Sequence, residues 1–237
     1  MSERKRQGGR TPASVTAGRE RGRLPAAAQP AAGVSARTRP AEARRQAILE
    51  AALTVFAARG YEAARLDDVA AEAGVAKGTL YLYFKDKQAL FEELVLGALT
   101  PIMDRISAAR LSPDIEPLDV VAMFFALFQS EVLATRRKHL LRLIIAEGPR
   151  FPAIAEFYYR EVVVRGLALM RDVANAAVAR GQFASDAAAR FPQLIVAPLL
   201  LAVIWDGLFA EIEPLDVAGL LGAHRELISA GAGGQQP

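Results

Sequence analysis

Two short stretches with apolar residues at helical spacing, separated by Gly74 and Val75, limit the possible folds of this chain of 237 residues more than any other feature. Residues 66–73 carry apolar side chains at helical spacing, and the stretch stops at Gly74. Residues 76–84 place Leu80 and Phe84 one turn apart on an inner face. A longer periodic stretch precedes both. Two short helices joined by a tight turn behind a longer helix predict a helix-turn-helix unit.

The remaining chain predicts further helices and no sheet. From Ala41 onward, alanine is abundant, and Pro or Gly separates long stretches with apolar residues at helical spacing. We therefore expect an all-α fold. The expected helices cover 41–59, 66–73, 76–84, 86–99 ended by Pro101, a short helix reaching 110, 118–134, 136–147, 151–180, 187–209 and 215–230, with a kink or late start near Pro192 and Pro198.

The charge is divided unevenly along the chain. The overall formal charge is +3, but residues 1–40 hold nine basic side chains against two acidic ones, so they carry +7 and the rest carries −4. Residues 1–40 have no apolar periodicity and predict a disordered basic tail, and 231–237 predict a flexible C-terminus. The tail is either an arm that enters the minor groove of DNA or a solvated extension without function, which a misassigned start would also produce.

Composition argues against several classes of protein. The chain has no cysteine, and only His139 and His224 could supply imidazole, so we expect no metal site and no cofactor. The longest apolar run, Leu194 to Trp205, has 12 residues and is short of the roughly 20 that a membrane span needs. No apolar region of a signal peptide follows the basic start. These features predict a cytoplasmic protein without a membrane partner.

Residues 60–61 and 66–91 closely resemble the DNA-binding region of TetR-family transcriptional regulators, and the resemblance is dense over 45–91. A weaker resemblance, over 143–147, 150–152 and 157–158, is to the ligand-binding portion of AefR-like members. The family resemblance implies an N-terminal three-helix DNA-binding domain, which we place at 41–88. It also implies a larger helical effector-binding and dimerisation domain, which we place at 89–230.

The expected DNA contacts lie around the second short stretch. With Leu80 inward, Gly78 and Tyr81 point outward and Thr79 lies at the flank, while Lys77 at the helix start could reach base edges together with Gly78. The resemblance implies phosphate contacts for the tyrosines and for Lys87. The full predicted set is Arg44, Arg45, Arg65, Lys77, Gly78, Thr79, Tyr81, Tyr83 and Lys87. Alternatively, Tyr83 packs the three-helix unit, Lys85 and Lys87 are solvated charges, and Gly78 only relieves crowding.

Two positions depart from the family pattern. Arg65 and Ala76 precede the two short helices, where the family commonly has Ser or Thr. A side-chain N-cap is therefore missing from each helix, at a cost of about 1 kcal/mol for a lost cap. Arg65 could instead bind phosphate directly.

An effector pocket and a dimer interface are expected in the larger domain. Pocket candidates are aromatic, apolar and a few polar residues, namely Phe124, Phe125, Phe128, Gln129, His139, Leu143, Glu147, Phe151, Tyr158, Tyr159 and Trp205. Plain core is the more common role for most of them, and for His139, beside three basic residues, the favoured alternative is a surface position. The segments 151–180 and 194–209 are expected to pair with their copies in a homodimer, because 194–205 is apolar on nearly all faces. The alternative for 194–209 is an intramolecular core helix.

These features predict a sequence-specific DNA-binding regulator rather than an enzyme. The expected mechanism is a repressor that leaves a palindromic operator on double-stranded DNA when an unknown small apolar effector binds. One alternative is an activator or a DNA-binding protein without effector control. A helical ligand-binding protein or an enzyme with a vestigial helix-turn-helix is the alternative of another class, and no paired carboxylates, nucleophile-base set or glycine-rich phosphate loop supports it.

Overall fold

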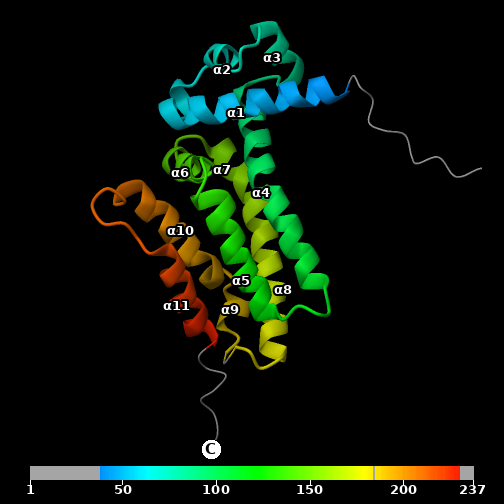
Figure 1. Cartoon of the computed structure of the whole chain (residues 1–237), viewed down its shortest axis with the longest axis vertical. Coiled ribbons are helices and arrows are strands. Elements are labelled where there is room, and N and C mark those ends of the chain that lie inside the picture. The colour runs from blue at the N-terminus through cyan, green and yellow to red at the C-terminus, as the bar shows by residue number, and fades with distance from the viewer. Residues whose placement is uncertain (1–37, 184, 230–237) are drawn as a thin grey trace, which may run out of the picture.

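The computed structural model describes residues 38–183 and 185–229, and every regular element within these ranges is helical. The all-α expectation is therefore confirmed. Figure 1 shows α1, α2 and α3 grouped at one end of the molecule, which we call the head, and α5 to α11 forming the longer body. Helix α4 leaves the head and runs along the body. Residues 1–37 of the predicted basic tail and the predicted flexible C-terminus lie outside the described residues, whereas residues 38–40, also predicted to be disordered, form the start of a helix.

The head contains α1 (Thr38–Ala63), α2 (Leu66–Glu72) and α3 (Lys77–Tyr83). The long first helix is interrupted at Gly60, whose φ of 75° is in the region that favours glycine. A side chain at this position would also meet the Glu147 carboxylate, because an added Cβ would lie 3.0 Å from Oε1. Gly60 therefore serves both the turn and the close approach of the body.

Helix α4 (Lys87–Leu111) is longer than predicted. It begins at Asp86, whose side chain accepts a hydrogen bond from the Ala89 backbone N–H over 2.7 Å. The predicted end at Pro101 is wrong, because the helix continues through this exposed proline. Buried side chains on both sides of it, including Leu99 and Ile102, hold the helix in the core, so packing outweighs the hydrogen bond that proline cannot donate.

The body is built from helices with two π turns. Its elements are α5 (Pro117–Phe128), η1 (Gln129–Leu133), α6 (Lys138–Glu147), α7 (Pro152–Tyr158), η2 (Tyr159–Val163), α8 (Val164–Ala179), α9 (Ala187–Arg190), α10 (Gln193–Leu208) and α11 (Val217–Ser229). The helix predicted over 151–180 thus contains a π turn, and the one over 187–209 is divided at Phe191 and Pro192. Helix α10 continues through the buried Pro198.

No single helix in the described part of the chain is long and apolar enough to cross a membrane. The segments Pro117–Leu133 and Lys138–Glu147 reach that length and composition only together, across a bend of 84°.

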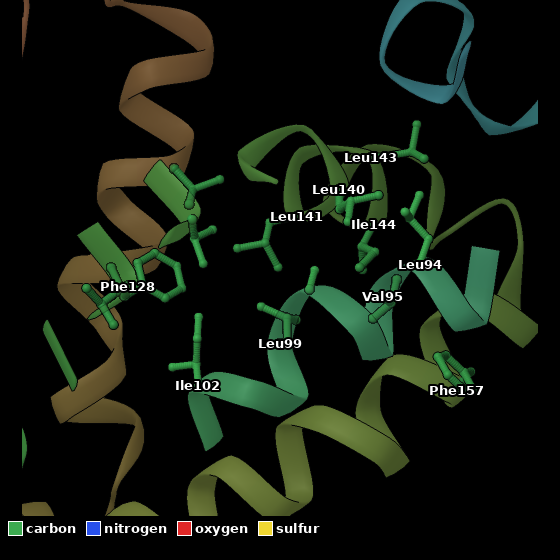
Figure 2. Packing of buried hydrophobic residues seen from close by; sticks show 14 of the residues in the cluster. Leu94, Val95, Leu99, Ile102, Phe128, Leu140, Leu141, Leu143, Ile144 and Phe157 are labelled. Atoms are coloured by element: carbon green, nitrogen blue, oxygen red, sulfur yellow. The ribbon is translucent and has the colours of Figure 1, made fainter. Parts of the chain in front are cut away.

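One continuous hydrophobic core joins the head to the body. At the junction, the Tyr61 ring lies 5.8 Å from Phe56, 5.3 Å from Phe91 and 5.2 Å from Phe151, measured between ring centroids. Further into the body, Figure 2 shows leucine, isoleucine and phenylalanine side chains of different helices meeting around Leu99. The shared core fixes how α4 carries the head relative to the body.

Candidate nucleic-acid interface and body cavity

The turn between α2 and α3 sets the position of the second helix. Gly74 has a φ of 65°, and the Val75 N–H donates to the Ala70 carbonyl over 3.0 Å, which closes the end of α2. Buried Leu80 then anchors α3 against the head core. The first residues of α3 therefore project from the outer end of the molecule, as Figure 1 shows for the helix as a whole.

The outer face of α3 is exposed, as the sequence predicts. Lys77, Gly78 and Tyr81 are exposed, and nothing lies within 4 Å of a Cβ added at Gly78. Leu82 shares this face and is 84% exposed, which is unusual for so large an apolar side chain. Thr79 is only partly exposed, at the flank, and Tyr83 packs against the core cluster in a half-buried position. This exposed face combines the ammonium group of Lys77, the accessible backbone of Gly78, and the side chains of Tyr81 and Leu82. These groups suit contact with a DNA groove.

Lys77 is held by a carboxylate of the preceding helix. Its Nζ lies 2.7 Å from Asp67 Oδ1 and 2.9 Å from Oδ2, with both side chains more than half exposed. The hydrogen bond to Asp67 raises the pKa of Lys77. Because both groups face water, this pair orients the lysine more than it stabilises the fold.

The predicted arginines have different surroundings. Arg44 and Arg65 are exposed, and Arg65 has an extended backbone before α2 without a side-chain cap hydrogen bond. Arg45 instead pairs with Glu93 of α4, and its guanidinium lies 5.8 Å from the centre of the Phe84 ring. Arg45 therefore links α1 to α4, and Arg44 and Arg65 are the arginines on the open surface among the predicted three.

The ammonium group of Lys87 is held by backbone carbonyls and an aromatic ring. Its Nζ donates to the carbonyls of Tyr61, Glu62 and Ala64 at 2.7, 2.9 and 3.1 Å and lies 4.6 Å from the centre of the Tyr61 ring. Burial lowers the pKa of this lysine. The ammonium satisfies carbonyls at the end of α1, and the phosphate contact expected for Lys87 stays a prediction.

The body encloses an apolar cavity of about 220 Å³. Helix α4 contributes Leu99, Ile102, Met103 and Ile106, and Phe124, Phe128 and Leu141 come from α5 and α6. The chain from α7 to α8 contributes Tyr158, Val162, Val163, Gly166, Leu167, Leu169 and Met170, and α10 closes the space with Gln193, Val196, Leu199 and Leu200. Figure 2 shows Leu99, Ile102, Phe128 and Leu141, which come from three of these helices.

Two polar groups belong to the cavity lining, and no charged side chain does. Burial raises the pKa of Tyr158 to about 12, so its hydroxyl stays protonated at neutral pH. This hydroxyl forms no hydrogen bond to another described residue. Gln193 and Leu200 are exposed members of the lining, and both belong to α10, which places the opening on that side.

Of the predicted pocket residues, Phe124, Phe128 and Tyr158 line this cavity. Phe125 faces His224, Phe151 packs on Tyr61, and Trp205 donates to the Glu213 carbonyl over 2.7 Å. The others also lie outside the lining, namely Gln129, His139, Leu143, Glu147 and the exposed Tyr159. Burial and the neighbouring Arg142, Lys138 and Arg136 lower the pKa of His139.

Sequence reasoning missed the aliphatic lining of α4, α8 and α10. Spacing offered one signal, since Tyr158, Val162, Gly166 and Met170 recur every four residues. A regular α-helix would rotate such positions gradually off one face, but the wide turn of η2 contains more residues per turn and keeps them together. The π turn itself was not predicted, so this face was not recognised.

The outer side of α10 is a continuous apolar stripe. Leu194, Leu201, Ile204 and Leu208 are between 41% and 66% exposed and follow helical spacing. Ile195, Leu199 and Val203 on the opposite side are fully buried. The alternative of an entirely intramolecular core helix is therefore wrong for the isolated chain, because only one side of α10 is covered.

Two family models match separate parts of the chain. Residues 48–94 match the model described as bacterial regulatory proteins, tetR family, and residues 118–216 match that of the AefR-like transcriptional repressor, C-terminal domain. The first match contains the whole α2–α3 unit, and the second contains most of the cavity helices.

Individual proteins show the same likeness. The HTH-type transcriptional repressor KstR2 of Mycolicibacterium smegmatis is 30% identical over 146 residues, covering 60% of this chain and 69% of that protein. The uncharacterized regulator YvdT of Bacillus subtilis is 40% identical over 67 residues, but the match covers only 28% of this chain and about a third of that protein. Among solved structures, FadR from Bacillus subtilis in complex with stearoyl-CoA has a TM-score of 0.62 and 21% identity, covering 78% of this chain and 98% of that one.

Proposed function

Since the chain belongs to the TetR family of bacterial regulatory proteins, we propose that it acts in the cytoplasm as a transcriptional repressor that binds a palindromic operator as a homodimer and is released by a small effector. The observation that carries this proposal is the outer face of α3. Lys77, Gly78 and Tyr81 stand exposed together at the end of the head. Within this proposal residues 41–88, which contain α2, α3 and most of α1, read DNA, and residues 89–230 sense the effector and dimerise.

A short recognition helix reads only a few base pairs, so two copies are needed for a specific site. The apolar stripe of α10 supports a dimer through this side of the body, because such a stripe is costly to leave in water. Two copies of α3 would then enter successive major grooves about 34–36 Å apart. An effector that binds a differently spaced state better would lower operator affinity by shifting the population.

Selection of bound fragments from random double-stranded DNA tests the binding mode. We expect a palindrome whose half-sites lie about one or two helical turns apart. On the selected fragment, Lys77→Ala and Tyr81→Ala should abolish specific binding in gel shifts without unfolding the protein, whereas Arg136→Ala, a matched loss of an exposed cation on the body, should bind as the wild type. Binding without sequence preference, or wild-type gel shifts for both head variants, would refute the assignment.

Sedimentation tests the assembly. Ile204→Glu places a charge in the centre of the α10 stripe and should convert a dimer to monomers, with loss of operator binding at unchanged helix content. Glu211→Gln, a change at an exposed position beyond α10, is the control. A wild-type monomer that still binds the full palindrome tightly would count against the proposed dimer.

A further inference from the structure

The body cavity has a composition that selects among effectors. Its lining is hydrocarbon, aromatic and thioether apart from the Tyr158 hydroxyl and the Gln193 amide. A carboxylate or phosphate that entered it would lose water without gaining a cation in the lining, which disfavours anionic ligands. We infer that the effector is an uncharged, mainly apolar molecule with one hydroxyl or carbonyl group that hydrogen-bonds to Tyr158, and this inference rests on the proposed effector control.

The position of Tyr158 supports a single polar contact. Tyr158 is partly buried and packs against the core, while the next residue, Tyr159, is 61% exposed, so the two neighbouring phenols face different surroundings. The Tyr158 hydroxyl remains protonated and can donate or accept one hydrogen bond. A ligand that offers this hydroxyl a hydrogen-bonding partner within the apolar lining gains one directional contact.

The volume of the cavity limits the size of the ligand. A cavity of about 150 Å³ accommodates benzene, so by proportion 220 Å³ suits roughly nine or ten non-hydrogen atoms before any rearrangement. A substituted single ring with a short side chain has this size. The structurally similar FadR of Bacillus subtilis was solved with stearoyl-CoA, a much larger anionic ligand, so the inferred ligand class differs from the one named there.

Calorimetric titration of the full chain with matched probes tests the class. Cinnamyl alcohol is neutral and of the expected size, and thymol is neutral and one atom larger. Cinnamate is the anionic counterpart of cinnamyl alcohol, and octanoyl-CoA represents acyl-CoA. We expect the neutral probes to bind at least about tenfold more tightly than cinnamate and octanoyl-CoA. The inference would be overturned if either anion bound as tightly as the neutral probes or more tightly. It would also be overturned if neither neutral probe bound up to its solubility limit.

Variants show whether the probes occupy this cavity. Gly166 lines the cavity with nothing within 4 Å of an added Cβ, so Gly166→Leu should fill it and abolish binding of cinnamyl alcohol. Gly222→Leu, at an equally open glycine of α11, should bind as the wild type. Tyr158→Phe should weaken binding roughly three- to tenfold, and Tyr159→Phe should have no effect. Wild-type binding by both Gly166→Leu and Tyr158→Phe would contradict the assignment.

Gel shifts with the selected operator separate this inference from the proposed function. Neutral probes that bind by calorimetry and release DNA support both. Neutral probes that bind without releasing DNA support the ligand class and contradict the gating. Failure of the probes to bind a protein that still binds its palindrome contradicts the ligand class alone.

Discussion

In the head, the exposed face proposed to read DNA belongs to a helix of seven consecutive residues, whereas the body cavity is assembled from helices spread between Leu99 and Leu200. The head therefore presents its chemistry outward through a local pattern, and the body keeps its chemistry inside through tertiary packing. The two sites therefore differ in how well they can be predicted: a local sequence pattern predicts the first, whereas the second depends on tertiary packing.

The largest expected effect concerns a residue that both regions share. Phe91 is fully buried and lies edge-on to Phe56 and Tyr61 at the junction. Phe91→Ala should lower the free energy of unfolding by about 3–5 kcal/mol, because it removes a packed ring and leaves a cavity. Denaturant unfolding followed by circular dichroism measures this change.

The same experiment tests how separate the head is. If the shared core couples the regions, the loss should appear in a single cooperative transition. Two transitions, with only the first shifted, would show that the head unfolds independently of the body. The exposed Leu82→Ala is the control and should leave the midpoint almost unchanged.

A second prediction concerns Lys87, which joins α4 to the carbonyl end of α1. Lys87→Met keeps much of the stem but removes the three hydrogen bonds to carbonyls, and we expect a loss of about 1–3 kcal/mol in unfolding free energy. Lys85→Met, at a side chain that is 82% exposed, should change stability little. If Lys87→Met left stability unchanged but weakened operator binding, the result would favour the phosphate contact predicted for Lys87 from the sequence.

The smallest expected effect lies at the start of α2. Arg65→Ser supplies the missing side-chain N-cap, because the backbone at this position is already extended, and should raise the free energy of unfolding by about 1 kcal/mol. If Arg65 binds phosphate, operator affinity should fall at the same time. A variant that gains stability and keeps full affinity would leave Arg65 without a DNA role. Thermal unfolding and gel shifts on one preparation measure both quantities.

The sequence was sufficient for the all-α class and for the outer face of α3, because helical spacing around Leu80 and Gly74 decides which side chains point outward. It did not predict the carbonyl contacts of Lys87, because these partners lie more than twenty positions away in the chain. It was also insufficient for most of the cavity, since aliphatic residues such as Ile106 and Val196 look the same whether they line a space or fill it. Helix α4 continues through Pro101, because the packing of its buried side chains outweighs the tendency of proline to end a helix.

The pairing of Lys77 with Asp67 has a consequence for the salt dependence of DNA binding. A free lysine that binds a phosphate releases about one condensed cation from the duplex. Each such contact therefore makes the logarithm of DNA affinity fall more steeply with the logarithm of salt concentration. In the proposed complex with DNA, Lys77 must first leave a carboxylate that it contacts at 2.7 Å, and the exposed Asp67 then attracts a cation of its own. The cation taken up at Asp67 offsets part of the cation release from the DNA. The number of phosphate contacts inferred from a salt titration would therefore be lower than the number of cations that touch the duplex.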